Sequence, residues 1–444
     1  MKLSDLLDTL DKESKKLLSA FFQEKKIRSS MPHDHRVAEM LELDARMGGA
    51  LTQTLTEHLL TLKAYLQGRP VKLEHLTFIL RNIASSYEVK LTSTDLKLIS
   101  YYASHPEATP SEAAANLKVA PSWERRRRGE LVRKNVISFP AVVNPARLGL
   151  RKVVVLVDEP QTSGEEVNVS LAKWLTAEHL LWGGPPLLLQ VYTVPAGWAW
   201  LPIRELNPVR AWLVRSTAYG LNTASYEPGL GWKLNVEAWG VYFKELLAEG
   251  WEVPSESSWR RVEHEGTPLP LEAWEVKAAA LLAADTRMRL EALAEAIGKS
   301  LAAAHQCKQK LLADALTPIL NLNHVGLSES LLLILEELDV SFQAVEAALR
   351  ELPKIWVYKV EDFRGSEELL CWLELPSGLT HKLTRVLEEV LAPVAKYSLY
   401  FRGYHLGSSL PSPSLYNGKK KSWQPPQPAA EKLKPSRLEK KRSL

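Results

Sequence analysis

A dense run of basic side chains is the part of this sequence best suited to binding an anionic partner. Four consecutive arginines stand at 125–128, and Arg133 and Lys134 follow closely. The guanidinium group is planar, and its fork of N–H donors matches phosphate oxygens and the O6 and N7 atoms of guanine. The pattern therefore indicates contact with double-stranded DNA. The residues expected to make it are Ser122, Arg125, Arg126, Arg127, Arg128, Arg133 and Lys134.

A solvated helix face is the simpler interpretation of the same run. Neighbouring arginines on a helix repel one another and point in several directions, so some of them stay in water. The position of the arginine run on the helix favours DNA binding over a solvated face. The N-terminal half of a recognition helix enters the major groove, and its basic neighbours contact phosphates.

Other kinds of chemistry find little support. Gly229-Leu230-Gly231 leads into no dinucleotide-binding fingerprint, and neither a zinc-protease motif nor a nucleophile elbow occurs. His33 and His35 stand between charged residues, as in a solvated turn, and His264 lies between two glutamates. We therefore expect no catalytic residue, no metal and no cofactor.

Three helices are expected to position the basic run. Leu96, Leu98, Ile99 and Tyr102 form an apolar stripe at helical spacing. The segment Thr109-Pro110-Ser111-Glu112 is typical of a capping box with proline at the first helical position. Pro121 and Ser122 open the third helix, which carries the arginines.

Two short apolar pairs follow the third helix. Val136 with Ile137 and Val142 with Val143 are separated by Phe139-Pro140, a pattern that suits the two strands of a wing hairpin. Three short helices and a wing, with a basic third helix, describe a winged helix-turn-helix over 91–150.

This unit resembles the leucine-responsive (Lrp/AsnC) family of transcription regulators. The likeness is carried by RRRRGELVRKNVI, as recognition helix and first wing strand, and by VVNPARLGLRKVVVLV, as the hinge into an effector domain. The family is usually apolar where this chain has Arg125 and Arg128, so Trp123, the stem of Arg127 and Leu131 are expected to be buried instead. The resemblance implies a ferredoxin-like effector domain, an amino-acid effector, and domains that pair through their sheets.

The remaining sequence predicts that this arrangement occurs twice. A strand at 153–157, helices at 169–181 and 207–216, a strand at 187–194 and a weak strand at 221–226 approximate βαββαβ. After a connector with one helix at 236–248, three further helices are expected between 274 and 312. A clearer βαββαβ pattern then spans 331–401. Leu131 corresponds to Leu311 and Gly149 to Gly326, so the chain is predicted to be an internal duplication.

The second copy of the basic helix is weaker. Leu301, Ala304, Cys307 and Leu311 are expected on one face, and Lys308 and Lys310 could contact DNA. A degenerate copy kept for packing is an equally good interpretation.

The fold class expected is α+β, with tandem winged helix-turn-helix and ferredoxin-like domains. The chain has 444 residues, a net charge of +4, 45% hydrophobic and 24% charged residues, which suit several globular domains. Two cysteines, Cys307 and Cys371, fit a reducing cytoplasm, and neither a signal peptide nor a membrane span is expected. The domains are placed at 1–90 (helical), 91–150, 151–228, 229–268 (connector), 269–326, 327–403 and 404–444 (a disordered basic tail).

The function expected is a cytoplasmic, sequence-specific DNA-binding transcription regulator that is not an enzyme. The two copies would pair within one chain or in a homodimer. Two alternatives stay open: a non-catalytic interaction scaffold with degenerate winged helices, and a tetrapyrrole decarboxylase-like enzyme of the kind that some Lrp-like proteins are.

Overall fold

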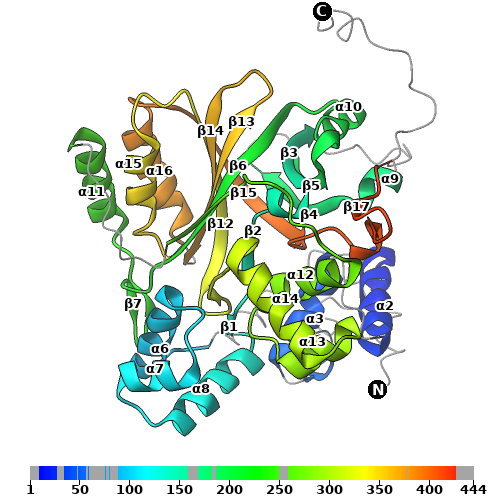
Figure 1. Cartoon of the computed structure of the whole chain (residues 1–444). Coiled ribbons are helices and arrows are strands. Elements are labelled where there is room, and N and C mark those ends of the chain that lie inside the picture. Colours follow the sequence, from blue (N-terminus) through cyan, green and yellow to red (C-terminus); the bar gives the residue numbers. More distant parts are fainter. Residues whose placement is uncertain are drawn as a thin grey trace, which may run out of the picture.

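The computed structural model describes 10–27, 35–47, 49–56, 89–158, 169–182, 187–249, 259–376 and 378–426, besides the single positions 59, 76 and 80. The chain forms an α+β fold in which helices surround a large antiparallel sheet (Figure 1). No helix among these residues is long and apolar enough to cross a membrane.

Three helices form the first head, which we define as residues 89–135. They are α6 (Ser93–Ser104), α7 (Pro110–Leu117) and α8 (Pro121–Arg133). The capping box predicted at Thr109 is confirmed, since its hydroxyl accepts from the backbone N–H of Glu112 and the Glu112 carboxylate accepts from that of Thr109. Thr92 and Asp95 form a second capping box at the start of α6.

The second head, residues 271–315, repeats this order. Its helices are α12 (Ala273–Ala284), α13 (Leu290–Ile297) and α14 (Leu301–Asp314). Ala304, Cys307 and Leu311 are buried on one face of α14, as their spacing predicts. Leu301 does not join them, because its side chain is 51% exposed.

The expected wing hairpin is wrong. The short strands are β1 (Ile137–Ser138), β2 (Ala141–Val143), β10 (Leu316–Pro318) and β11 (Asn321–Leu322). β1 pairs with β11 and β2 with β10, so each copy pairs with the other and not with itself. The β1–β2 segment and the β10–β11 segment occupy equivalent places in the two copies, and they pair with each other in antiparallel orientation. A local twofold axis therefore relates them. This ribbon therefore joins the two heads.

Two four-stranded units follow the heads, each in the order βαββαβ. The first contains β3 (Leu150–Asp158), α9 (Val169–Ala172), β4 (Leu175–Trp182), β5 (Leu187–Pro195), α10 (Leu201–Leu206) and β6 (Arg210–Leu221). The second contains β12 (Leu327–Glu336), α15 (Phe342–Leu349), β13 (Lys354–Asp362), β14 (Glu367–Pro376), α16 (Thr380–Leu391) and β15 (Lys396–Gly407). Their strand orders, β4-β5-β3-β6 and β13-β14-β12-β15, correspond strand for strand.

Parts of the first unit differ from the sequence prediction. The segments 169–181 and 207–216 were expected to be helical, but only Val169–Ala172 is a helix, and most of the remainder supplies β4 and the start of β6. The weak strand expected at 221–226 is likewise replaced by the long β6, which ends at Leu221, and by the short β7 (Tyr226–Glu227). The reason is tertiary pairing, since β4 hydrogen-bonds to β15 and β6 to β13, both from the second unit. A strand covered on both faces loses the alternation that would reveal it.

The same two pairings close the sheet. Eight strands form a continuous ring, and β9 (Arg260–Glu263) is added beside β6. Alternate residues of β12 face opposite sides: Leu331, Leu333 and Leu335 pack with α15 and α16. Leu332 and Ile334 face inward and meet Val154 and Leu156 of the other unit.

The connector and the C-terminal segment complete the cores. The helix expected at 236–248 is confirmed as α11 (Val236–Glu249), which packs on the second unit (Figure 1).

The prediction that the C-terminal tail is disordered is wrong up to residue 426. β16 (Tyr416–Asn417) and β17 (Ser422–Trp423) form a hairpin, and the buried Trp423 donates from Nε1 to the Leu148 carbonyl at 2.7 Å. Residues 427–444 lie outside the described part.

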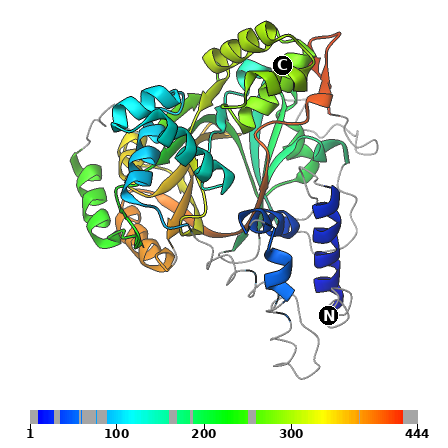
Figure 2. The same ribbon diagram turned by 90° about the horizontal axis from the view of Figure 1, so that it is seen from below.

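The N-terminal region is helical where it is described. α2 (Lys12–Ile27) and α3 (His35–Arg46) share a core of their own. Figures 1 and 2 place them on the opposite side of the molecule from α11. Glu42 of α3 joins them to the ribbon, since its carboxylate accepts from His324 Nε2 at 2.8 Å and Asn135 Nδ2 at 3.0 Å. His33 and most of the predicted helical region between 57 and 88 lie outside the described residues.

Candidate nucleic-acid interface

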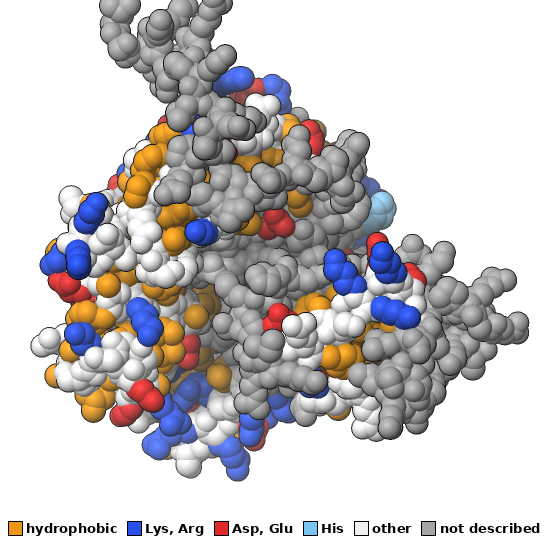
Figure 3. All heavy atoms as spheres, turned by 90° about the vertical axis from the view of Figure 1, so that its right-hand side faces the viewer, with side chains coloured by type: hydrophobic (Ala, Val, Ile, Leu, Met, Phe, Trp, Pro, Cys, Tyr) orange, Lys and Arg blue, Asp and Glu red, His pale blue; other side chains and the backbone are white. Residues whose placement is uncertain are grey.

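The basic run divides into an outer and an inner set on α8. Ser122, Arg125, Arg126, Arg133 and Lys134 are exposed, whereas Arg127 and Arg128 are half-buried. Arg125 and Arg126 make no ion pair with any residue that the structure describes. Figure 3 shows several Lys and Arg side chains at the lower end of the molecule, where Figure 1 places α8.

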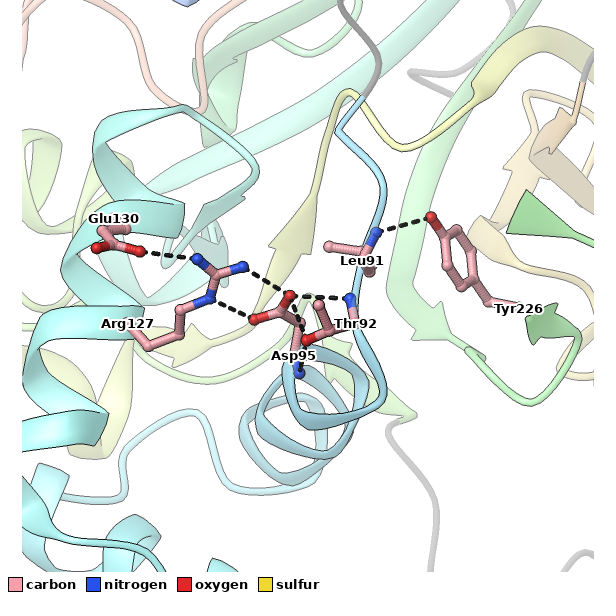
Figure 4. Close-up of polar contacts among 6 residues, drawn as sticks. All are labelled: Leu91, Thr92, Asp95, Arg127, Glu130 and Tyr226. Atoms are coloured by element: carbon pink, nitrogen blue, oxygen red, sulfur yellow. Dashed lines mark hydrogen bonds and ion pairs between the residues drawn. The ribbon is translucent and has the colours of Figure 1, made fainter. Parts of the chain in front are cut away.

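Arg127 binds within the head. Its Nε and Nη2 atoms donate to the two carboxylate oxygens of Asp95 at 2.5 and 2.7 Å, and Nη1 donates to Glu130 at 2.7 Å (Figure 4). Burial alone would raise the pKa of Asp95, but hydrogen bonds from Arg127 and Thr92 hold it below its ordinary value. The bidentate pair fixes α8 against the start of α6.

Arg128 is the end of a second polar chain. Its Nε donates to Glu124 at 2.8 Å, and the same carboxylate oxygen accepts from the Tyr102 hydroxyl at 2.7 Å. Glu124 is fully buried although it lies in the first turn of α8. Burial and the hydrogen bond to Glu124 raise the pKa of Tyr102 well above its ordinary value, so the phenol stays protonated and donates.

Arg287 extends this chain to the second head. Its guanidinium carbon lies 4.5 Å from the Tyr102 ring centre and 4.2 Å from that of Phe139. Its Nη2 donates to the carbonyls of Pro106 and Ala108 at 2.8 and 2.7 Å. The loop before α13 is thereby attached to the loop before α7, and the two heads are held in one orientation.

A shallow hollow of about 470 Å³ lies between α8 and the start of α6. Its lining residues are Thr92, Thr94, Trp123, Arg126, Arg127 and Glu130. Arg126 provides an exposed guanidinium that forms no ion pair with a described carboxylate, and the exposed Thr94 provides a hydroxyl on the same hollow. The hollow can therefore accept an anionic oxygen. Because the Glu130 carboxylate also lines it and repels anions, it is not a strong phosphate site.

Lys308 and Lys310 are both engaged inside the second head. Lys308 Nζ donates to the Met288 carbonyl at 3.2 Å, and burial lowers its pKa. Lys310 Nζ donates to the Pro270 carbonyl at 3.1 Å and forms an ion pair with Glu275 at 2.9 Å. The structure thus places these two lysines apart from the exposed basic residues of α8.

Sequence reasoning missed the inner partners Asp95, Glu124 and Arg287. A signal existed only for Asp95, because Thr92 and Asp95 have capping-box spacing just before the stripe of α6. Glu124 looks like an ordinary acidic residue in a first helical turn, and Arg287 like a solvated loop residue. Their partners lie on other elements, so no local pattern identifies them.

A second hollow occurs at the seam between the two units. It has a volume of about 530 Å³ and lies where β6 meets the end of β12 and the β13–β14 turn. Arg210 forms ion pairs there with Glu336 and with Glu368, the latter at 2.7 Å. Arg364 and Phe363 lie at its exposed edge. We call this hollow the seam pocket.

Comparison with known proteins yields a distant likeness in fold. No family model matches the sequence, and no curated protein matches it. The crystal structure of the siroheme decarboxylase NirDL aligns with 70% of this chain and 90% of its own, at 12% identity and a TM-score of 0.42. Its co-complex with an iron-uroporphyrin III analogue aligns with 68% and 88%, at 12% identity and a TM-score of 0.39. A likeness this distant assigns neither an activity nor a site to this chain.

Proposed function

We propose that this protein is a sequence-specific DNA-binding transcription regulator of the Lrp/AsnC type, and that α8 is its principal DNA-reading element. The observation that carries the proposal is the division of the arginines. Two of them hold α8 in place, which leaves Arg125 and Arg126 exposed on a helix whose orientation is fixed. A rigid helix with unpaired guanidinium groups is what base reading requires.

Charge supports the same conclusion. Residues 89–135 contain nine Lys and Arg against five Asp and Glu, a net charge of +4 that equals that of the whole chain. In the proposed complex, Ser122, Arg125 and Arg126 approach base edges, while Arg133 and Lys134 meet phosphates. Arg127 and Arg128 position the helix.

The test is DNA affinity as a function of salt. Arg125→Ala/Arg126→Ala should weaken binding to the recognised sequence, and Arg133→Ala/Lys134→Ala should reduce the slope of log K against log salt by about 0.9 for each phosphate that is no longer neutralised. Arg385→Ala is the matched control, because Arg385 is an exposed arginine on α16. Unchanged affinity in the first double variant and an unchanged slope in the second, with both folded, would refute the proposal.

Failure to bind DNA would leave the two alternatives, and a second measurement separates them. A tetrapyrrole decarboxylase-like enzyme would change the absorbance of an added iron–tetrapyrrole carboxylate, whereas an interaction scaffold would not. That the chain is not an enzyme stays a prediction until this is measured.

An amino-acid effector is the second part of the proposal, and the seam pocket favours it. Arg364 offers a guanidinium for a carboxylate, and the lining carboxylates Glu368 and Asp362 offer acceptors for an ammonium group. An occupant would contact both units at once and could alter how they sit together. Amino acids should raise the melting temperature, and Arg364→Ala should abolish that rise without changing the melting temperature of the free protein.

A further inference from the structure

The two heads present different side chains at equivalent positions of α8 and α14. Leu131 and Leu311 are both almost fully buried, so the two helices can be aligned residue by residue about these positions. Ser122 then corresponds to Ala302, Arg125 to His305 and Arg126 to Gln306. The equivalents of Arg133 and Lys134 are Ala313 and Asp314.

The exposed face of α14 is close to neutral. Its exposed residues are Leu301, Ala302, His305, Gln306, Gln309, Ala313 and Asp314. Asp314 is paired with Arg147 at 2.8 Å, and the lysines of this helix bind within the head. Residues 271–314 carry six basic and six acidic side chains, a net charge of zero against +4 for the first head. The exposed face of α14 therefore offers phosphates no Lys or Arg side chain among the residues that the structure describes.

The chemistry of this face nevertheless matches one kind of base pair. A glutamine side chain can form two hydrogen bonds with adenine N6 and N7, and an apolar side chain packs on the thymine methyl group. Gln306 and Gln309 provide the first, and the exposed Leu301 and Ala302 provide the second. Guanine, by contrast, is best read by arginine; α8 exposes Arg125 and Arg126, whereas the exposed face of α14 carries no arginine.

We propose that the chain reads a non-palindromic, bipartite DNA site. The first head reads a guanine-containing half-site and supplies most of the electrostatic affinity, and the second head reads an A·T-rich half-site through neutral contacts. The local twofold ribbon and the Arg287 link hold the heads in one fixed relation, so the half-sites should lie about one helical turn apart, or a multiple of it. This inference rests on the proposed function and adds the identity of each half-site.

The experiment is selection of bound sequences from random duplexes with the full chain, followed by affinity measurements on the site recovered. Wild type should select two unlike half-sites at constant spacing. Gln306→Ala/Gln309→Ala should lose selection only in the A·T-rich half, with roughly ten-fold lower affinity for each adenine that is no longer bound and an unchanged salt slope. Gln343→Ala on α15, an exposed glutamine far from both heads, is the matched control.

The possible outcomes distinguish failure of this inference from failure of the proposed function. A palindromic site, or a site with only one half-site and no effect of the glutamine variant, overturns the inference while DNA binding itself stands. Absence of salt-dependent DNA binding overturns the proposed function. Loss of the guanine half in Arg125→Ala/Arg126→Ala, together with a retained A·T-rich half, supports both.

Discussion

The two heads have the same helices in the same order, yet they attach their third helices by different means. α14 is anchored mainly by apolar packing of Ala304, Cys307 and Leu311, beside an ion pair between Lys310 and Glu275. α8 buries Leu131 but is otherwise held by two ion-pair networks, through Asp95 and through Glu124. The position that is Ala304 in the second head is Glu124 in the first.

This difference shows how a helix can keep a basic surface without losing its orientation. Two inward arginines neutralise two buried carboxylates, so α8 carries five arginines but exposes only three of them, Arg125, Arg126 and Arg133. The arrangement has an energetic cost, since buried ion pairs are often no more stabilising than apolar residues, while breaking one partner is strongly destabilising. The first head should therefore be the more sensitive of the two to a single substitution.

Glu124→Ala tests that sensitivity most severely. This substitution gives the first head the alanine that the second head has at the equivalent position. It leaves Arg128 and the buried Tyr102 hydroxyl without their partner. We expect a loss of about 3–5 kcal/mol in the free energy of unfolding, measured by urea denaturation. Glu107→Ala, at an exposed acidic position, should change it by less than about 0.5 kcal/mol.

A combined variant sharpens the comparison. Adding Tyr102→Phe and Arg128→Met to Glu124→Ala removes all the polar members together, so no buried group is left unpaired. Part of the stability should return. If the triple variant is less stable than Glu124→Ala alone, apolar packing cannot replace this network and the two heads are not interchangeable.

How far the sequence predicts this picture depends on the range of the interaction. The Thr109 capping box and the helix 236–248 depend on neighbours in the chain, and both are confirmed. The pairing of β1 with β11, the strand character of β4 and β6, and the order in 408–426 depend on partners from the other half. The inward direction of Arg127 and Arg128 likewise depends on Asp95 and Glu124. A sequence of four identical arginines does not by itself indicate which of them face inward.

The Asp95 pair should make the first head sensitive to acid. Because the pKa of Asp95 is lower in the folded protein, its contribution is full above the ordinary carboxyl pKa and is lost as pH falls through the folded value. Asp95→Asn should cost about 2 kcal/mol at neutral pH. The difference from wild type should shrink as the pH drops below about 4. A difference that stays constant down to pH 3 would mean that the charge of Asp95 contributes nothing.

Arg287→Ala should separate the heads with a smaller effect on stability. It removes two hydrogen bonds to carbonyls and the stacking on Tyr102 and Phe139, together about 1–2 kcal/mol. The ribbon still joins the heads, so each should fold. We expect the selected DNA sites to keep both half-site sequences but to lose their constant spacing. Lys277→Ala, which changes a basic residue on α12, should leave the spacing unchanged.

The smallest effect on stability and the most direct test of the comparison come from making the second head resemble the first. His305→Arg/Gln306→Arg places guanidinium groups at the positions that correspond to Arg125 and Arg126. Both side chains are exposed, so the free energy of unfolding should change by less than about 0.5 kcal/mol. If α14 lies against DNA as α8 does, the salt slope should steepen by about 0.9 for each further phosphate that the new arginines neutralise, and the A·T-rich half-site should acquire guanine. Salt dependence and selected sequence that both equal those of wild type would place α14 away from the DNA, and the first head would then be the only reader.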